Sequence, residues 1–143
     1  MTDLLSQYHL ALQALMLMFA TLMVQSLVAA TAHRSQQRYI PGVLDSQLGH
    51  ESFVFRSHRT FMNSLENLPL MVGPAIVGML AGFDAAQLGI MCWIYAICRI
   101  LHMALYYLIA TEKNPSPRSY FYMVGLLVNV TMLVVVFMHV MEV

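Results

Sequence analysis

Three groups of polar side chains lie within or beside the long apolar stretches of this sequence. The first group consists of Arg56, Arg59, Asn63 and Glu66, at spacings of three, four and three residues that place them on one face of a helix. A guanidinium, an amide and a carboxylate aligned in this way can bind a small molecule that carries charges of both signs. They can equally be an ion-paired helix face at a membrane boundary, and both interpretations stay open here.

Arg99, His102 and Tyr106 form the second group, again at helical spacings of three and four. Arg99 lies so deep in its apolar stretch that its guanidinium cannot comfortably reach water. A cation at that depth needs a carboxylate, backbone carbonyls or a bound anion as its partner. Glu66 is the acidic residue closest in expected depth, so a purely structural Glu66–Arg99 bridge between helices is the alternative to a binding role.

Arg118, Ser119 and Tyr122 form the third group, at the start of the last apolar stretch. Pro117 precedes them and suits the first position of a helix. Alone, Arg118 and Tyr122 fit the positively charged flank and the interfacial tyrosine of a membrane helix. Together, the three groups predict a pocket near one end of several helices, suited to a small zwitterion with surplus negative charge.

Long apolar helices must position these residues. Of the 143 residues, 59% are hydrophobic and 10% are charged, with a mean hydropathy of +0.68, whereas a soluble domain has about 25% charged residues. Soluble and disordered classes are thereby excluded, and a formal net charge of zero gives no basic field for nucleic acid. The sequence predicts one all-α membrane domain, 1–143, with four transmembrane helices at about 4–32, 52–83, 85–111 and 118–141.

The charge distribution predicts the orientation. Arginines gather between the first and second helices, and Lys113 and Arg118 stand between the third and fourth, whereas the opposite side carries only acidic residues. By the positive-inside rule, both basic connections face the cytoplasm and both termini face away. No basic residue precedes the first apolar stretch, so we expect a retained helix there rather than a signal peptide. Cys92 and Cys98 do not share a helix face, and no metal site is expected.

The sequence resembles the MAPEG family, the membrane-associated proteins in eicosanoid and glutathione metabolism. Three motifs carry the resemblance, in this order: Arg59-x3-Asn63-x2-Glu66-Asn67-x-Pro69, Arg99-x2-His102-x3-Tyr106 and Arg118-Ser119-x2-Tyr122. With the four-helix layout, the resemblance covers nearly the whole chain and is closest to microsomal glutathione transferases. It implies a four-transmembrane-helix bundle assembling as a homotrimer, with glutathione held between adjacent protomers near the cytoplasmic side.

The resemblance also implies a role for each matching residue. Six of them would bind glutathione or line its pocket: Arg59, Asn63, Glu66, Arg99, His102 and Tyr106. Three would act in catalysis, with Arg118 and Ser119 beside the glutathione sulfur and Tyr122 completing that wall. In some members an arginine at the end of the first helix binds glutathione, and either Arg34 or Arg38 can take that place.

The activity that the resemblance implies is transfer of glutathione to lipophilic electrophiles, together with reduction of lipid hydroperoxides. Two other classes stay open: a non-catalytic lipid-binding scaffold of the same family, and a small transporter. A pocket lined with cations argues against the scaffold, and polar groups crowded at one membrane side argue against the transporter. Phe61, which stands where animal members often have His or Gln, leaves the electrophile open. The chain ends without a retention signal, so a bacterial inner membrane is expected over the endoplasmic reticulum.

Overall fold

The computed structural model describes residues 2–37 and 39–142. Within that part of the chain, apart from one isolated bridge between Ile40 and Val43, every regular element is helical. The helices are α1 (Thr2–Gln7), α2 (His9–His33), α3 (Phe53–Leu80), α4 (Ala85–Leu108) and α5 (Pro117–Glu142). The prediction of an all-α chain is confirmed.

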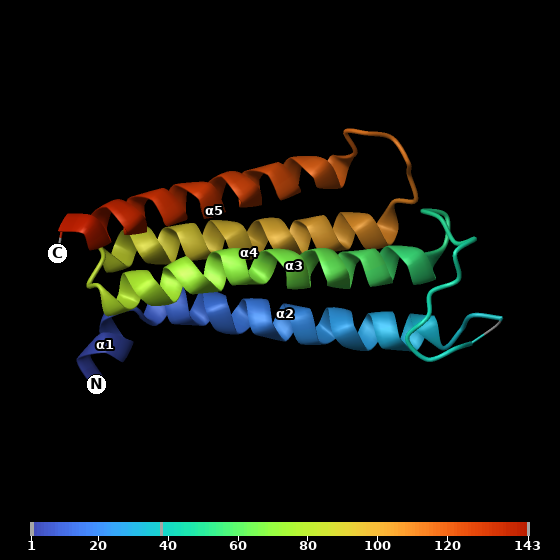
Figure 1. Cartoon of the computed structure of the whole chain (residues 1–143), viewed down its shortest axis with the longest axis horizontal. Helices are drawn as coiled ribbons and strands as arrows, with labels where there is room; N and C mark the ends of the chain where they lie inside the picture. The colour runs from blue at the N-terminus through green and yellow to red at the C-terminus, as the bar shows by residue number, and fades with distance from the viewer. Residues whose placement is uncertain (1, 38, 143) are drawn as a thin grey trace.

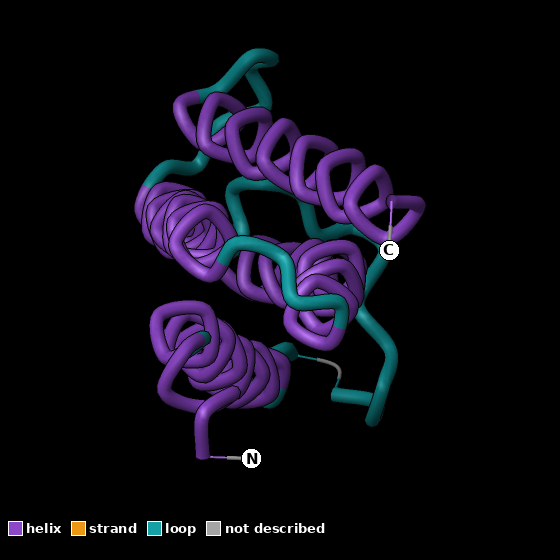
Figure 2. Tube along the Cα trace, turned by 90° about the vertical axis from the view of Figure 1, so that its left-hand side faces the viewer, coloured by secondary structure: helices purple, strands orange, loops and turns teal. Residues whose placement is uncertain are grey.

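The four long helices lie side by side and alternate in direction (Figure 1). Seen end-on, α3 and α4 occupy the middle of the bundle, with α2 on one side and α5 on the other (Figure 2). Both termini and the turn between α3 and α4 lie at one end, and the two longer connections lie at the other (Figure 1). The arginines near these connections therefore share one end of the bundle.

The structure divides the predicted helix at 4–32 into α1 and α2 at Tyr8. The Tyr8 side chain is buried, and its hydroxyl donates a hydrogen bond of 2.6 Å to the carbonyl of Phe83 in the turn between α3 and α4. A contact between residues so far apart in sequence has no signature in local periodicity, which explains why the sequence predicts one continuous helix.

The other helix ends follow local chemistry. α3 stops before Gly82, which adopts a left-handed backbone with φ of 73° that glycine allows without strain. The Asp84 carboxylate then caps α4 by accepting a hydrogen bond of 2.8 Å from the backbone N–H of Gln87. α4 ends at Leu108, three residues before the predicted 111, and α5 begins at Pro117, one residue earlier than predicted. Proline at this first position needs no N–H donor.

Three helices, α2, α4 and α5, are long and apolar enough to cross a membrane. α3 is the longest helix, with 28 residues, but it carries Arg56, Arg59 and Glu66 in its first half and contains two prolines. Three of the four predicted spans therefore correspond to helices that are long and apolar enough to cross a membrane. α3 differs from them because its polar half is part of the site described below.

Small side chains allow the helices to pack closely. Ala11 and Ala14 of α2 are fully buried, and Gly89 of α4 lies opposite α2. A Cβ atom added at Gly89 would lie 2.8 Å from the Cβ of Leu10, a distance that real Cβ atoms essentially never show. Because both atoms are attached to helix backbones, the clash can be relieved only by moving α2 away from α4.

We predict that Gly89→Ala lowers the melting temperature of the protein in detergent relative to Gly73→Ala. Both substitutions gain the same helix propensity, but a Cβ at Gly73 meets nothing within 4 Å. Overpacking of the α2–α4 contact should cost about 1–3 kcal/mol, and thermal unfolding measured by circular dichroism tests it. Equal melting temperatures for the two variants would contradict close packing at Gly89.

Candidate functional site

Arg99 is the most deeply buried cation of the bundle and is 2% exposed. Its Nη2 donates hydrogen bonds to Asn63 Oδ1 at 2.7 Å and to Ser64 Oγ at 3.0 Å, both on α3. The carboxylate partner that the sequence suggested, Glu66, points elsewhere and is exposed. The structural Glu66–Arg99 bridge is therefore wrong, since the hydrogen bonds of the guanidinium go to neutral oxygen atoms of α3, and its buried Nε has no partner among the described residues.

The Arg99 contact fixes the orientation of Asn63. Because Oδ1 accepts the hydrogen bond from Arg99, the Nδ2 group of Asn63 is the end of the amide that can donate to a ligand. Asn63 lines a pocket together with Arg59, so this wall of the pocket carries an amide and a positive charge. Ser64, which the sequence analysis did not single out, is the second hydrogen-bond acceptor for Arg99 on α3.

The pocket has a volume of about 200 Å³ and lies among α3, α4 and α5 near the end of the bundle that holds the long connections. Seven of the predicted site residues line it: Arg59, Asn63, His102, Tyr106, Arg118, Ser119 and Tyr122. They come from three helices that are distant in sequence, so the fold, and not local spacing, brings them together. Arg99 lies directly behind Asn63.

Arg118 is held against the ring of Tyr106. Its Cζ atom lies 3.9 Å from the ring centroid, a distance at which a guanidinium is attracted to the aromatic face. Its Nη2 also donates a hydrogen bond of 3.4 Å to the carbonyl of Thr111. No carboxylate lines the pocket, so the charge of Arg118 is available to an anion.

Ser119 has a local role at the start of α5. Its Oγ accepts a hydrogen bond of 3.1 Å from the backbone N–H of Ser116 and lies 3.0 Å from Ser116 Oγ. These bonds fix the turn that leads into α5 and so the place of Arg118. Tyr122 is one turn further along, with its ring 6.3 Å from that of His102, and the two aromatic rings form the inner wall of the pocket.

His50 contacts the pocket wall from the connection between α2 and α3, a position that the sequence analysis missed. Its Nδ1 lies 3.4 Å from the hydroxyl of Tyr106, and the two rings stack with centroids 5.8 Å apart. Arg56 fixes the backbone there, because its Nη1 donates to the carbonyls of His50 at 2.7 Å and Glu51 at 2.9 Å. Arg56, which shares a helix face with Arg59 in the sequence, thus supports this connection and does not line the pocket.

The other predicted site residues do not line the pocket of a single chain. Glu66 is exposed on α3, and Arg34 is exposed at the C-terminal end of α2. Arg38 lies outside the described residues. Within the described residues, no group of three or more His, Cys, Asp or Glu side chains could hold a metal ion.

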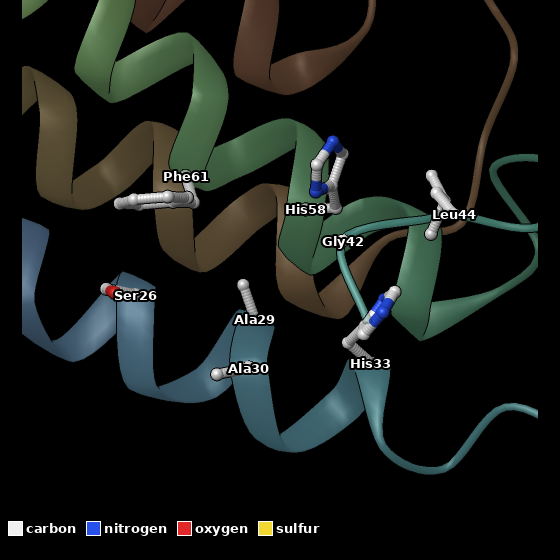
Figure 3. A pocket seen from close by; sticks show the side chains of 8 residues that line it. All are labelled: Ser26, Ala29, Ala30, His33, Gly42, Leu44, His58 and Phe61. Atoms are coloured by element: carbon white, nitrogen blue, oxygen red, sulfur yellow. The ribbon is translucent and has the colours of Figure 1, made fainter. Parts of the chain in front are cut away.

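A second pocket, of about 220 Å³, lies on another side of α3, between that helix, α2 and their connection (Figure 3). None of the predicted site residues lines it, and its walls are mainly apolar. His33 is already engaged there, since its Nε2 lies 3.1 Å from the carbonyl of Ile40 and its Nδ1 lies 2.8 Å from Gln36 Nε2. Phe61 faces this second pocket and not the polar one.

The polar pocket thus combines cations, hydroxyl groups and aromatic walls at one end of a bundle with membrane-spanning helices. The MAPEG family model matches residues 10–138, which is nearly the whole chain. The chain belongs to the MAPEG family. No curated protein and no solved structure matches it. As a MAPEG protein, it is a membrane protein of the kind that acts in glutathione and eicosanoid metabolism, a family with enzymatic and non-enzymatic members.

We predict that Asn63→Leu destabilises the MAPEG fold by about 2–3 kcal/mol, because it removes a hydrogen bond to a buried charged group. Asn67→Leu, one turn away on α3, is the matched control. Asn67 Nδ2 donates only a neutral bond of 2.8 Å to the carbonyl of Asn63, so its loss should cost about 1 kcal/mol. Chemical denaturation in detergent measures both values, and equal losses would refute the support of Arg99 by Asn63.

Proposed function

We propose that this protein is an integral membrane glutathione transferase that conjugates the glutathione thiolate to lipophilic electrophiles. The observation that carries the proposal is the guanidinium of Arg118, seated on Tyr106 in a pocket that also holds Arg59, Asn63, Ser119 and Tyr122 and no carboxylate. Family membership supports it. We extend the proposal to reduction of lipid hydroperoxides: the thiolate would attack the terminal oxygen and release the lipid alcohol, and a second glutathione would convert the resulting sulfenic acid to glutathione disulfide and water.

The charges of the pocket suit glutathione, which has two carboxylates, one ammonium group and a thiol. Arg59 and Arg118 can each form charge-assisted hydrogen bonds with a carboxylate or a thiolate. Asn63 presents its Nδ2 donor, because Arg99 occupies its oxygen. His102 and Tyr106 enclose the ligand, and Glu66, exposed on the same helix as Arg59, would take the ammonium group.

The chemical task of the site is to ionise a thiol. A free thiol has a pKa near 8.5, so about 3% is thiolate at pH 7, and only the thiolate is an effective nucleophile. Arg118 would stabilise the thiolate by Coulomb attraction, with a hydroxyl of Ser119 or Tyr122 donating a hydrogen bond. A decrease of about two pKa units corresponds to about 2.7 kcal/mol and would ionise most of the bound thiol at pH 7. The thiolate then bonds to the electrophilic carbon, and the leaving group departs.

We propose a homotrimer in which each chain is one domain of four spans, with α3 as the fourth. The charge-free residues 67–80 of α3 supply most of the span, and the preceding polar half supplies the rest up to the cytoplasmic boundary. Glu66 and Arg34 are exposed in the single chain, so a neighbouring protomer can bring them to the pocket. Both termini would then face away from the cytoplasm, with a bacterial inner membrane as the expected location.

Arg118→Ala should decrease kcat at pH 7 by about 20- to 30-fold, because the bound thiol returns to its ordinary pKa. The dissociation constant of the Arg118→Ala variant for glutathione should change much less than kcat. Raising the pH to about 9 should recover much of the lost rate, since the thiol then ionises without help. Conjugation of glutathione to a chloronitroarene, with isothermal titration calorimetry for binding, measures both quantities.

Lys113→Ala is the matched control for Arg118→Ala, because Lys113 is an exposed cation in the connection that leads into α5. It should leave kcat and affinity unchanged. An equal decrease of kcat and affinity in Arg118→Ala, without recovery at high pH, would assign Arg118 to binding and contradict its role in thiol ionisation.

Arg59→Ala and Glu66→Gln should each raise the dissociation constant of glutathione about tenfold, because each removes a charge-assisted hydrogen bond of about 1.4 kcal/mol or more. Calorimetric titration of the purified protein tests this. Glu51→Gln is the control for Glu66→Gln, since Glu51 is also exposed but follows His50 in the connection before α3. Unchanged affinity in either variant would refute that residue's assignment.

A further inference from the structure

We propose that His50 is a positioning residue for the proposed thiolate site: it holds the Tyr106 ring, and through that ring the guanidinium of Arg118. The inference rests on the proposed function. His50 is absent from the three motifs that carry the family resemblance, and it reaches the pocket wall from the connection between α2 and α3. The chain of contacts is His50 to Tyr106 to Arg118, so His50 acts without touching the ligand.

Contacts other than the one with Tyr106 also hold His50 in place. Its ring lies edge-on to Phe55, with centroids 5.0 Å apart, and stacks on Tyr106 at an interplanar angle of 26°. Arg56 donates a hydrogen bond of 2.7 Å to the His50 carbonyl. The imidazole is therefore wedged between two aromatic rings on an anchored backbone, and its position does not depend on a free loop.

Tyr106 transmits this position to Arg118. Its side chain is 7% exposed, and the Arg118 Cζ atom lies over its ring at 3.9 Å from the centroid. The hydrogen bond between the Tyr106 hydroxyl and His50 Nδ1 holds the outer end of the ring in place. If the ring turns, the aromatic face no longer supports the guanidinium, and the cation is then less well placed to stabilise an anion in the pocket.

A neutral imidazole with its proton on Nε2 accepts at Nδ1 a hydrogen bond from the Tyr106 hydroxyl, whereas an imidazole with a proton on Nδ1 donates to that hydroxyl. Burial lowers the pKa of His50, and Arg118 of α5 lowers it further. Arg56 and Arg59 of α3 also lower the pKa, while Glu112 of the connection after α4 raises it.

Tyr106 of α4, which faces the same ring, is uncharged at neutral pH. The net result is a pKa below the ordinary 6.5, so the acceptor is present at pH 7. As the pH falls through that lowered value, Nδ1 gains a proton and can only donate, so the Tyr106 hydroxyl loses its acceptor.

The test compares His50→Ala with His50→Asn, whose amide oxygen keeps an acceptor near the Nδ1 position but cannot be protonated. The readout is the pKa of bound glutathione, followed by the ultraviolet absorbance of its thiolate, together with the dissociation constant. We expect His50→Ala to raise the thiol pKa by about half a unit to one unit, which is about a three- to tenfold loss of thiolate at limiting pH. Affinity should stay within about twofold, and His50→Asn should restore the wild-type thiol pKa.

Two further variants separate positioning from a general loss of structure. His58→Ala removes a histidine that lines the second pocket and should leave the thiol pKa unchanged (Figure 3). Tyr106→Phe removes the hydroxyl, so adding His50→Ala to it should raise the thiol pKa no further. If His50→Ala behaves as wild type, or if His50→Asn is as impaired as His50→Ala, the inference is overturned.

The contact itself can be tested without glutathione. Nitrogen NMR of histidine-labelled protein should show His50 as the Nε2–H tautomer at pH 7, with its Nδ1 resonance displaced by Tyr106→Phe. If wild-type protein binds no glutathione, the proposed function fails whatever the NMR result. If it binds glutathione and the Nδ1 resonance is insensitive to Tyr106→Phe, only the role of His50 fails.

Discussion

The burial of the Arg99 guanidinium between α3 and α4 is the constraint on which the site depends. Burying a cation at this depth is energetically costly unless polar groups bind it. Asn63 and Ser64, adjacent residues on α3, provide two oxygen atoms within 3.0 Å of one guanidinium nitrogen. These bonds set the rotation of α3 against α4, and the same rotation turns Arg59 toward Tyr106 and Arg118.

From this constraint the chemistry of the pocket follows. Arg99 occupies the oxygen of Asn63, Tyr106 seats Arg118, and Arg56 anchors the backbone of His50 behind Tyr106. The result is a polar concavity with cations and donors on its walls and no lining carboxylate. Such a site favours an anionic ligand and an ionised nucleophile.

Much of this arrangement could be predicted from the sequence, because helical periodicity records which residues share a face. The spacing of Arg59 with Asn63, and of His102 with Tyr106, places each pair on one wall of the pocket. Periodicity does not record how one helix is rotated against the next. For that reason Arg99 was expected to meet the carboxylate of Glu66, whereas its partners in the fold are neutral oxygen atoms.

The features that the sequence analysis missed depend on single contacts between distant residues. The break at Tyr8 coincides with one hydrogen bond from its side chain to Phe83, 75 residues later. His50 lies in a connection without periodicity, and its meeting with Tyr106, 56 residues later, depends on the path of that connection. Only the pairing of Arg56 with adjacent carbonyls could have been suspected, since a deeply placed arginine requires acceptors.

A structure of the protein with glutathione in lipid nanodiscs, determined by electron cryomicroscopy, tests the central claim most directly. The account predicts a trimeric particle with the tripeptide bound among Arg59, Asn63 and Tyr106, and with its sulfur beside the Arg118 guanidinium. Glutathione bound away from these side chains, or with its sulfur pointing away from Arg118, would contradict it.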